Sequence, residues 1–501
     1  MRLPFLFLAT CTLAMPVVGR DLAVKNAAEL RAAAAMAVSG DTIRLASGRY
    51  DDVKLRIAKN GTQGRPIQVV AAVPGEAVLG GASEIDISGA YIVIDGLYLL
   101  NGAISSGSAD RSVITFNSHH GVVRNTAIVD YNPADFATAY YWVFFNGSHN
   151  TLERCYFKGK NNLEPLIGNG LENAQYNSVV GCYFKNIPYD VGNGREDIRV
   201  WGSGKFDEKT SDGAYFLIQG NLFDHADGEG TEIISLKSNF NQVLNNTVRA
   251  TRGGINIRRG ANNTLKGNII LGEGVEGAHG LRMSGANHVV QGNYVSGCDY
   301  GIRVSAGEFT AYALTPDYAP KEKSNAKTAK NANGVVTTYP QSKKITLSNN
   351  VVVACDGPDL ELGSDYKKHW PQEQMVLLPS DCDISGNRFV RPKGGVSVEV
   401  ASPESQFASL AAKSLANRYR SNVVVGGKLK GAAGSGFKVE DLASGWSEKR
   451  ELGELRPLKP EDVGPPWVIA FRSAGRFEVE DDMSCSRDPA AKKVKKAKKA
   501  K

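Results

Sequence analysis

The feature of this sequence that most constrains its fold is a short segment that recurs along most of the chain. Each copy has apolar residues, a small or polar pair, an asparagine or cysteine, and then further apolar residues. The copies are VVRNTAI (122–128), LERCYF (152–157), VVGCYF (179–184), LIQGNLF (217–223), VLNNTV (243–248), TLKGNII (264–270), VVQGNYV (289–295), TLSNNVV (346–352) and ISGNRF (384–389), with the asparagine or cysteine at positions 125, 155, 182, 221, 246, 268, 293, 350 and 387. The shortest intervals between these positions are 22, 25, 25, 27 and 30 residues. A repeat of this length predicts a solenoid.

The recurring segments favour strands over helices, because they are short, rich in β-branched residues and punctuated by Gly and Asn. We therefore predict an all-β fold, a single-domain right-handed parallel β-helix over residues 20–400, with coils from about residue 41. An asparagine that points inward at the same turn of every coil can hydrogen-bond to its neighbours. Such a ladder would satisfy backbone groups that the core removes from water.

Both ends of a solenoid need a cap. Residues 26–38, NAAELRAAAAMAV, carry Ala and Leu on one face and are followed by Gly40, which predicts an N-terminal capping helix. An insertion at 306–343 is rich in Lys, Ala, Asn and Pro, and a loop of that length is usually either functional or disordered. Beyond residue 405 the repeat fades, and ESQFASLAAKSLANRYRS (404–421) has a helical pattern. We interpret 401–488 as a continuation of the solenoid or its C-terminal cap.

The N-terminus resembles a signal for export. Arg2 precedes a short apolar run, and the run is too short to span a membrane. We interpret residues 1–19 as a signal peptide, and we expect a secreted or periplasmic protein without a transmembrane segment.

The net charge of +7 is a property of the C-terminal tail. The last ten residues, KKVKKAKKAK, contain seven lysines and no acidic residue, so the rest of the chain is close to neutral. We interpret residues 489–501 as a Lys-rich disordered tail, which either is solvated or adheres to an anionic surface. A neutral body does not predict a nucleic-acid partner, and we expect a monomer.

Six cysteines remain after removal of the expected signal peptide, which is too few for a disulfide scaffold in a chain of this size. No spacing among them resembles a zinc site. Cys155 and Cys182 occupy the repeat position in consecutive coils, so they are either stacked buried thiols or a disulfide between coils.

Charged residues near the middle of the chain suggest chemistry. EIISLKS (232–238) ends a run of strand-forming residues with Lys237, and INIRRG (255–260) contains Arg258 twenty-one residues later. That separation is about one coil, so the two side chains should be neighbours on stacked strands. A third motif, GNGREDIRV (192–200), precedes them.

These three motifs resemble polysaccharide lyase family six, the family of alginate lyases and chondroitinase B. The resemblance covers about residues 40–400 and implies that Lys237 is the general base and Arg258 the general acid or transition-state stabiliser. A lyase of this kind removes the proton next to a uronate carboxylate and expels the glycosidic oxygen. The reaction needs cations that offset the charge growing on the carboxylate, and positive charge near a lysine favours its neutral, basic form.

The resemblance also implies a calcium site. In the family an Asn and a Glu-x-Glu pair hold the ion with oxygen ligands, and Asn193 and Glu232 match the Asn and the second Glu. The first Glu falls on Gly230, with Glu229 one residue earlier. A one-residue slip turns a side chain to the other face of a strand unless a bulge intervenes, so the sequence leaves calcium binding and metal-independent action both open.

Further basic residues lie on strand-like segments of different coils and could together form a cationic track for an acidic polymer. The candidate substrate-binding residues are Arg199, Arg259, Arg282, Arg303 and His279.

The sequence therefore predicts an exported polysaccharide lyase that cleaves a uronate-containing polymer by β-elimination, with alginate as the expected substrate. Dermatan sulfate is the alternative substrate. A hydrolase or epimerase on the same fold is a rival, but a hydrolase needs paired carboxylates across the groove, and the sequence places no acidic pair with the Lys and Arg motifs. A non-catalytic glycan-binding β-helix would not need a base with an arginine one coil away.

Overall fold

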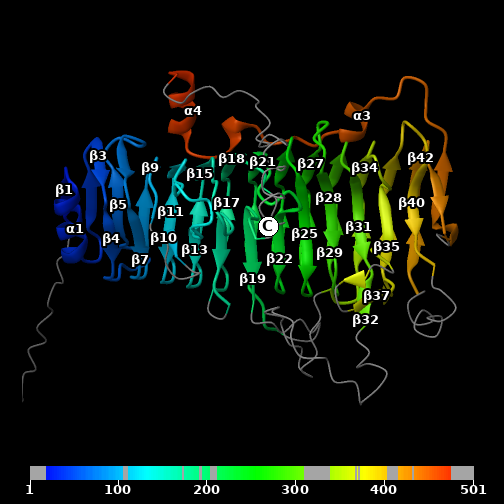
Figure 1. The fold of residues 1–501 in the computed structure, drawn as a ribbon, viewed down its shortest axis with the longest axis horizontal. Coiled ribbons are helices and arrows are strands. Elements are labelled where there is room, and N and C mark those ends of the chain that lie inside the picture. Colours follow the sequence, from blue (N-terminus) through cyan, green and yellow to red (C-terminus); the bar gives the residue numbers. More distant parts are fainter. Residues whose placement is uncertain are drawn as a thin grey trace, which may run out of the picture.

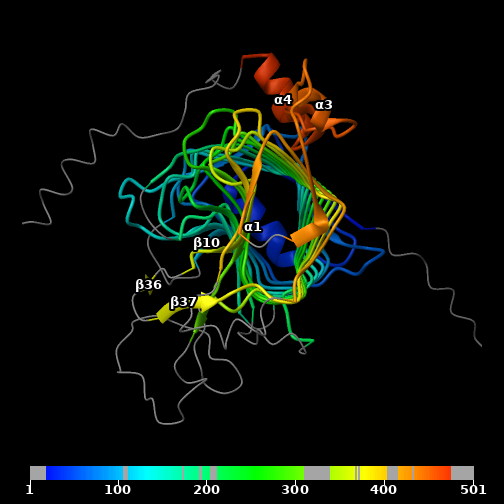
Figure 2. The same cartoon turned by 90° about the vertical axis from the view of Figure 1, so that its right-hand side faces the viewer.

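The computed structural model describes residues 19–104, 111–171, 174–190, 194–202, 211–309, 339–366, 369–370, 373–402, 416–431 and 434–475. Three long parallel sheets wrap around one core and form the predicted parallel β-helix (Figures 1 and 2). Successive coils contribute one strand to each sheet, so each strand pairs with strands of the coils before and after it. Within the described residues, no helix is long and apolar enough to cross a membrane. The expected Lys-rich tail and all but the last residue of the expected signal peptide lie outside the described residues.

The strands of the three sheets follow one another in sequence order. The first sheet contains β1 (Asp21–Val24), β2 (Thr42–Leu45), β5 (Ile67–Ala71), β8 (Ile92–Asp95), β11 (Val122–Arg124), β14 (Thr151–Glu153), β17 (Ser178–Val180), β20 (Leu217–Gln219), β23 (Gln242–Leu244), β26 (Thr264–Lys266), β29 (Val289–Gln291), β33 (Thr346–Ser348), β38 (Asp383–Ser385) and β41 (Arg418–Arg420). The second sheet contains β4 (Lys54–Ile57), β7 (Glu84–Ile87), β10 (Ser112–Phe116), β13 (Tyr141–Phe145), β16 (Ile167–Asn169), β19 (Ile198–Trp201), β22 (Glu232–Lys237), β25 (Gly253–Arg259), β28 (Ala278–Met283), β31 (Tyr300–Ser305), β35 (Leu360–Ser364), β40 (Val396–Val400) and β43 (Lys428–Lys430). The third sheet contains β3 (Gly48–Asp51), β6 (Ala77–Gly80), β9 (Tyr98–Leu100), β12 (Ala127–Val129), β15 (Tyr156–Lys158), β18 (Tyr183–Ile187), β21 (Leu222–Ala226), β24 (Thr247–Arg249), β27 (Ile269–Leu271), β30 (Tyr294–Ser296), β34 (Val351–Val353), β39 (Arg388–Val390), β42 (Asn422–Val425) and β44 (Phe437–Glu440).

An asparagine ladder runs through the core as the repeats predict. The side-chain amide of each member donates to the side-chain oxygen of the next at 2.9 Å, and the members are Asn221, Asn246, Asn268, Asn293, Asn350, Asn387 and Asn422. The same oxygens accept backbone N–H groups of the preceding coil, for example Cys182 N at 2.8 Å. Each amide therefore satisfies backbone groups that have no access to water.

Two details of the ladder differ from the sequence prediction. Position 125 is off by one, because Ala127 pairs with Tyr156 and so places Thr126, not Asn125, opposite Cys155. Asn125 instead has a φ of 47° and donates to Asp95 in the turn. A second set of buried asparagines, which the repeat pattern did not single out, precedes the strands of the first sheet and includes Asn150, Asn177, Asn241 and Asn263.

The cysteines of the described chain are free and buried. Cys155 N donates to the Sγ of Cys182 at 3.4 Å, so these two residues are stacked thiols that continue the ladder. Of the two alternatives left open by the sequence, stacked thiols is the one observed.

The two ends of the solenoid are finished differently. Helix α1 (Ala27–Met36) covers the first coil, and Asn26 caps it by accepting the N–H of Glu29 at 2.9 Å. The strands of all three sheets continue past residue 400 as far as Glu440. Arg418–Arg420 is strand β41, so the helix expected over 404–421 is wrong at its C-terminal end; residues 403–415 lie outside the described chain.

After the last coil the chain turns back along the outer face of the third sheet. This returning segment contains η4 (Pro460–Asp462) and the helices α3 (Glu448–Leu452) and α4 (Pro466–Ser473), and Figure 1 shows both helices on the same side of the stack. Trp467 of α4 packs with Tyr98, Tyr156 and Tyr183 of the third sheet. Its indole N–H donates to the Asn125 carbonyl at 2.7 Å, which ties the segment to a coil more than 300 residues earlier.

A small antiparallel sheet projects from the stack beside β31 and β35 (Figures 1 and 2). Its strands are β32 (Gly307–Phe309), β36 (His369–Trp370) and β37 (Glu373–Leu377).

Candidate functional site

The site lies on the outer face of the second sheet, between β19 and β31. Side chains alternate in these strands, so Ile198 and Val200 of β19, like their counterparts in later coils, enter the core. The residues between them form one row across the outer face. In register order this row is Arg199, Ser235, Asn256, Arg282 and Arg303.

Lys237 ends strand β22 and lies one coil from the two arginines of INIRRG, as the sequence predicts. The register shifts between Leu236 and Lys237, so Lys237 pairs with Arg259 and Arg258 is the extra residue of a bulge. Arg259 is buried over the ring of Trp201, whereas Arg258 is partly exposed and lies over Tyr339. Burial and the neighbouring Arg258 lower the pKa of Arg259 to about 10.

Lys237 is held by a buried glutamate. Its Nζ donates to Glu196 Oε1 at 2.8 Å, and it also lies 5.0 Å over the ring of Trp201. Glu196 is fully buried, and burial alone would raise its pKa, but the charges of Lys237 and Arg199 lower the pKa below its usual value. Sequence reasoning missed Glu196. The available signal was its place in GREDIRV, three residues before Arg199.

Glu196 belongs to a cluster with Glu229 and Glu232. One carboxylate oxygen of each lies within 4.8 Å of the others, and all three residues are buried. Burial, Glu196 and Glu232 raise the pKa of Glu229 to about 7. The expectation that no acidic pair accompanies the Lys and Arg motifs is therefore wrong, because the coil fold brings Glu196 beside two glutamates that are more than 30 residues away in sequence.

Two glycines explain how Glu229 reaches the cluster despite the slipped spacing. Gly228 and Gly230 have φ values of 52° and 75°, a conformation that favours glycine. A side chain at position 230 would begin 2.3 Å from the ring of Tyr189, so no glutamate fits there. Glu229 Oε2 instead accepts the N–H of Gly194 at 2.7 Å, and its carboxylate joins that of Glu232.

The chemistry of this cluster fits a hard divalent cation such as calcium, which takes several oxygen ligands. Three buried carboxylates that repel one another are costly without a cation. Glu196 Oε2 accepts no hydrogen bond from the described residues, although it lies 3.5 Å from the guanidinium of Arg199. Glu196, Glu229 and Glu232 would hold the ion, while Asn193, the other expected ligand, lies outside the described residues.

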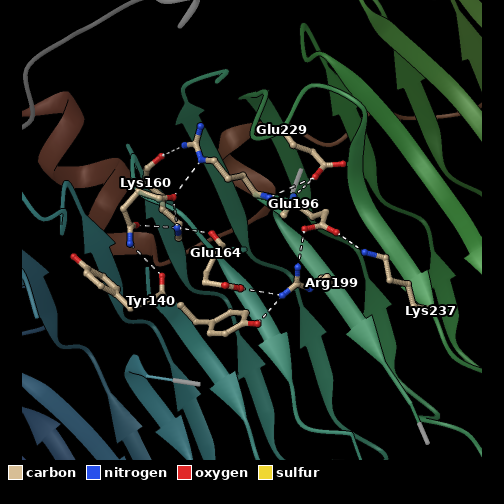
Figure 3. Close-up of polar contacts among 11 residues, drawn as sticks. Tyr140, Lys160, Glu164, Glu196, Arg199, Glu229 and Lys237 are labelled. Atoms are coloured by element: carbon tan, nitrogen blue, oxygen red, sulfur yellow. Dashed lines mark hydrogen bonds and ion pairs between the residues drawn. The ribbon is translucent and has the colours of Figure 1, made fainter. Parts of the chain in front are cut away.

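Arg199 connects the cluster to a second layer of polar residues (Figure 3). Its guanidinium lies 3.5 Å from Glu196 and 3.0 Å from Glu164, and it donates to the Tyr141 hydroxyl at 2.7 Å. Below this layer the buried Lys160 donates to the Glu164 carbonyl at 2.7 Å and to two oxygens of Asn162. Burial lowers the pKa of Lys160 well below its usual value. These contacts fix the loop that presents Glu164 to Arg199.

The predicted cationic track is in register but is not uniformly positive. Arg282 pairs with Asp365 at 3.1 Å, and Arg303 pairs with Glu361 and lies over the ring of Tyr300. Carboxylates from strand β35 and the turn after it therefore neutralise the two arginines on the C-terminal side.

His279 stacks on Tyr300 with ring centroids 4.7 Å apart. Burial lowers its pKa, although Asp299 acts in the opposite direction. The structure thus places all five candidate substrate-binding residues on the outer face of the second sheet or at its edge; their contacts with substrate stay a prediction.

Known proteins resemble this chain in sequence and fold. The chondroitinase B family model matches residues 24–306. The solved structure of the PL6 family polysaccharide lyase Pedsa3628 from Pseudopedobacter saltans is 36% identical, with 89% of this chain and 99% of that chain covered and a TM-score of 0.76. None of the curated proteins compared with the chain matches it.

Two further solved structures share the fold at lower identity. The PL6 family alginate lyase AlyGC is 22% identical, with 89% of this chain and 58% of that chain covered and a TM-score of 0.72. A mannuronic acid specific polysaccharide family 6 lyase from human gut microbiota is 21% identical, with 91% and 98% covered and a TM-score of 0.69.

Proposed function

This protein belongs to polysaccharide lyase family six, and from that premise we propose that it cleaves a uronate-containing polysaccharide by β-elimination, with alginate as the substrate. The observation that carries the proposal is the position of Lys237. It is buried at the end of β22, paired with Glu196, and one coil from Arg258 and Arg259. A lysine with an arginine on the neighbouring strand is what proton abstraction next to a carboxylate requires.

In this mechanism Lys237 removes the proton from C5 of the uronate. The electron pair of the C–H bond forms the C4–C5 double bond, and the C4–O bond to the neighbouring sugar breaks. Arg258, the more exposed of the two arginines, stabilises the departing oxygen until that oxygen takes a proton from water, and Arg259 adds positive charge beside Lys237.

A lysine acts as a base only in its neutral form, and Nζ of Lys237 lies 2.8 Å from the carboxylate of Glu196. When bound at the three glutamates, calcium would supply positive charge that offsets Glu196 and attracts the uronate carboxylate. Glu196, Glu229 and Glu232 would then orient the ion, while Arg199 and Glu164 hold Glu196 in place.

Alginate is proposed over dermatan sulfate because the glycosaminoglycan enzyme of the family has a tryptophan shortly after the strand that corresponds to β28. This chain has the small residues Ser284 and Gly285 after that strand.

A hydrolase is less well supported. Glycosidases place two carboxyl groups on either side of the scissile bond, about 5 Å or more apart. Here the oxygens of Glu196, Glu229 and Glu232 lie within 4.8 Å of one another, and Glu196 is bound to Lys237. That arrangement suits cation binding better than acid–base hydrolysis.

The test is the absorbance near 235 nm when purified protein is mixed separately with alginate, dermatan sulfate and pectate. We expect a rise with alginate, because elimination leaves a conjugated unsaturated uronate. A rise only with dermatan sulfate would support the alternative substrate. Reducing ends without absorbance would indicate hydrolysis, and binding without either product would indicate a glycan-binding protein.

A further inference from the structure

We propose that strand β35 and the turn after it end the substrate groove, so that at most two sugar residues bind on the C-terminal side of Lys237 and Arg258. This inference rests on the proposed function, and it predicts the size of the products. It follows from the order of charges across the outer face of the second sheet.

The side chains of the outer row change from positive to negative charge at β35. The register that joins Asn256, Arg282 and Arg303 continues to Glu361 of β35 and then to Glu399 of β40. Two coils with an arginine are therefore followed by two coils with a glutamate. A uronate polymer carries a carboxylate on each sugar, and like charges that meet away from bulk water repel each other.

Carboxylates of the same coil also form ion pairs with the two arginines. Glu361 pairs with Arg303, and Asp365, in the turn after β35, pairs with Arg282 at 3.1 Å. The carboxylate side chains are each only 17% exposed, so solvent screens them weakly. Glu361 and Asp365 thus stand where the carboxylates of further uronates would have to bind.

An apolar cluster lies at the same end. Tyr339, Met375 and Ala306 are buried together with Tyr366 packed against them, beside the small sheet of β32, β36 and β37. The ring of Tyr339 lies over both Arg258 and Arg282. This apolar cluster therefore lies against arginines on the C-terminal side of Lys237.

The distance between coils gives the number of sugars that fit on this side of the site. Stacked strands are about 4.8 Å apart, and an extended pyranose chain advances by a similar distance per sugar. Arg282 and Arg303 lie on the two coils between the catalytic arginine on β25 and Glu361 on β35. Each cut should accordingly leave a product of one or two sugars.

The experiment follows the first products formed from a defined uronate hexasaccharide, separated by anion exchange and identified by mass. We expect a monosaccharide or disaccharide with its pentasaccharide or tetrasaccharide partner, and no early trisaccharide. Early trisaccharide from the wild-type protein, with normal absorbance at 235 nm, would overturn the groove end and leave the lyase proposal intact. Absence of elimination on every uronate polymer would overturn both.

Variants then identify the cause. Glu361→Gln and Asp365→Asn together should make trisaccharide an early product, which the wild-type protein does not form. The matched control is Glu273→Gln, which removes a similar coil-to-coil partner, of Arg249 at 2.9 Å, outside the groove sheet. An unchanged product pattern in a folded double variant, as judged by its melting temperature, would contradict the electrostatic stop.

Discussion

The asparagine ladder and the part of the second sheet that carries the site are built from the same coils but obey different rules. Strand pairs of the first and third sheets, which flank the ladder, keep continuous register across the described coils. In the second sheet the register shifts at β22–β25, β25–β28, β31–β35 and β40–β43. Bulges re-aim side chains, and the shifts at β22–β25 and β31–β35 coincide with Lys237, Arg258 and the end of the arginine row. Regularity stabilises the stack, and most of the departures from it lie at the site.

The ladder and the site also use buried polar groups in different ways. Ladder amides satisfy one another completely, as Asn268 does with Asn246, Asn293 and the carbonyl of Val243. The site instead gathers like charges, with three glutamates together and Arg258 next to Arg259. Like charges held together raise the free energy of the folded chain, which is typical of sites that bind a charged ligand.

The largest effect after loss of Lys237 itself is expected for Glu196. Glu196→Gln removes the charge that holds Lys237 and one member of the carboxylate cluster, so kcat/KM should fall about 10- to 100-fold, as for other residues that orient a catalytic group. Absorbance at 235 nm measures the rate, and the control is Glu153→Gln on the exposed face of β14. A rate within twofold of wild type would show that the pair with Lys237 has no catalytic role.

A ladder substitution should do the opposite and change stability rather than chemistry. Asn268→Leu removes the acceptor of the Asn246 backbone N–H and of one side-chain N–H of Asn246, and it removes a donor to the Val243 carbonyl, which together cost about 2 to 3 kcal/mol. Urea unfolding measures this loss, with Lys266→Ala on the exposed face of the same coil as control. The activity of the folded variant should stay close to wild type; a large loss of kcat would break the separation between ladder and groove.

Stability should depend on pH through Glu229. Its folded pKa of about 7 lies above its usual value, so its protonation stabilises the fold below the unfolded pKa, and this contribution is lost as the pH rises through about 7. Added calcium should therefore raise the melting temperature more at pH 8 than at pH 5. The Glu229→Gln variant should lose most of the difference. Equal shifts at both pH values, or none, would contradict cation binding by the cluster.

The smallest effect is expected from reducing agent. Because Cys155 and Cys182 are free thiols in the ladder, as are the other cysteines of the described chain, reductant should leave the melting temperature unchanged. A clear decrease would show a disulfide between coils.

The sequence predicted the repeating parts of this molecule well, because each coil repeats the same local pattern. Thr126 shows the limit of that approach, since a one-residue shift within a turn is invisible without the strand register. Glu196 and the acidic partners of Arg282 and Arg303 could not be predicted, because each contact joins residues that come together only when coils stack. Tyr189 is a further case: its ring explains why position 230 is a glycine, and nothing near it in sequence indicates that contact.

The central claim is that Lys237 is the base, and the most direct test compares the 235 nm progress curves of wild type and Lys237→Ala on alginate. The matched control is Lys185→Ala, which removes another buried lysine that is paired across coils, with Asp224 at 3.0 Å, but on the third sheet. We predict that Lys237→Ala lowers the rate by about 100-fold or more while the protein still folds and binds alginate, and that Lys185→Ala stays active below its melting temperature. A folded Lys237→Ala protein that keeps more than about a tenth of the wild-type rate would contradict the account.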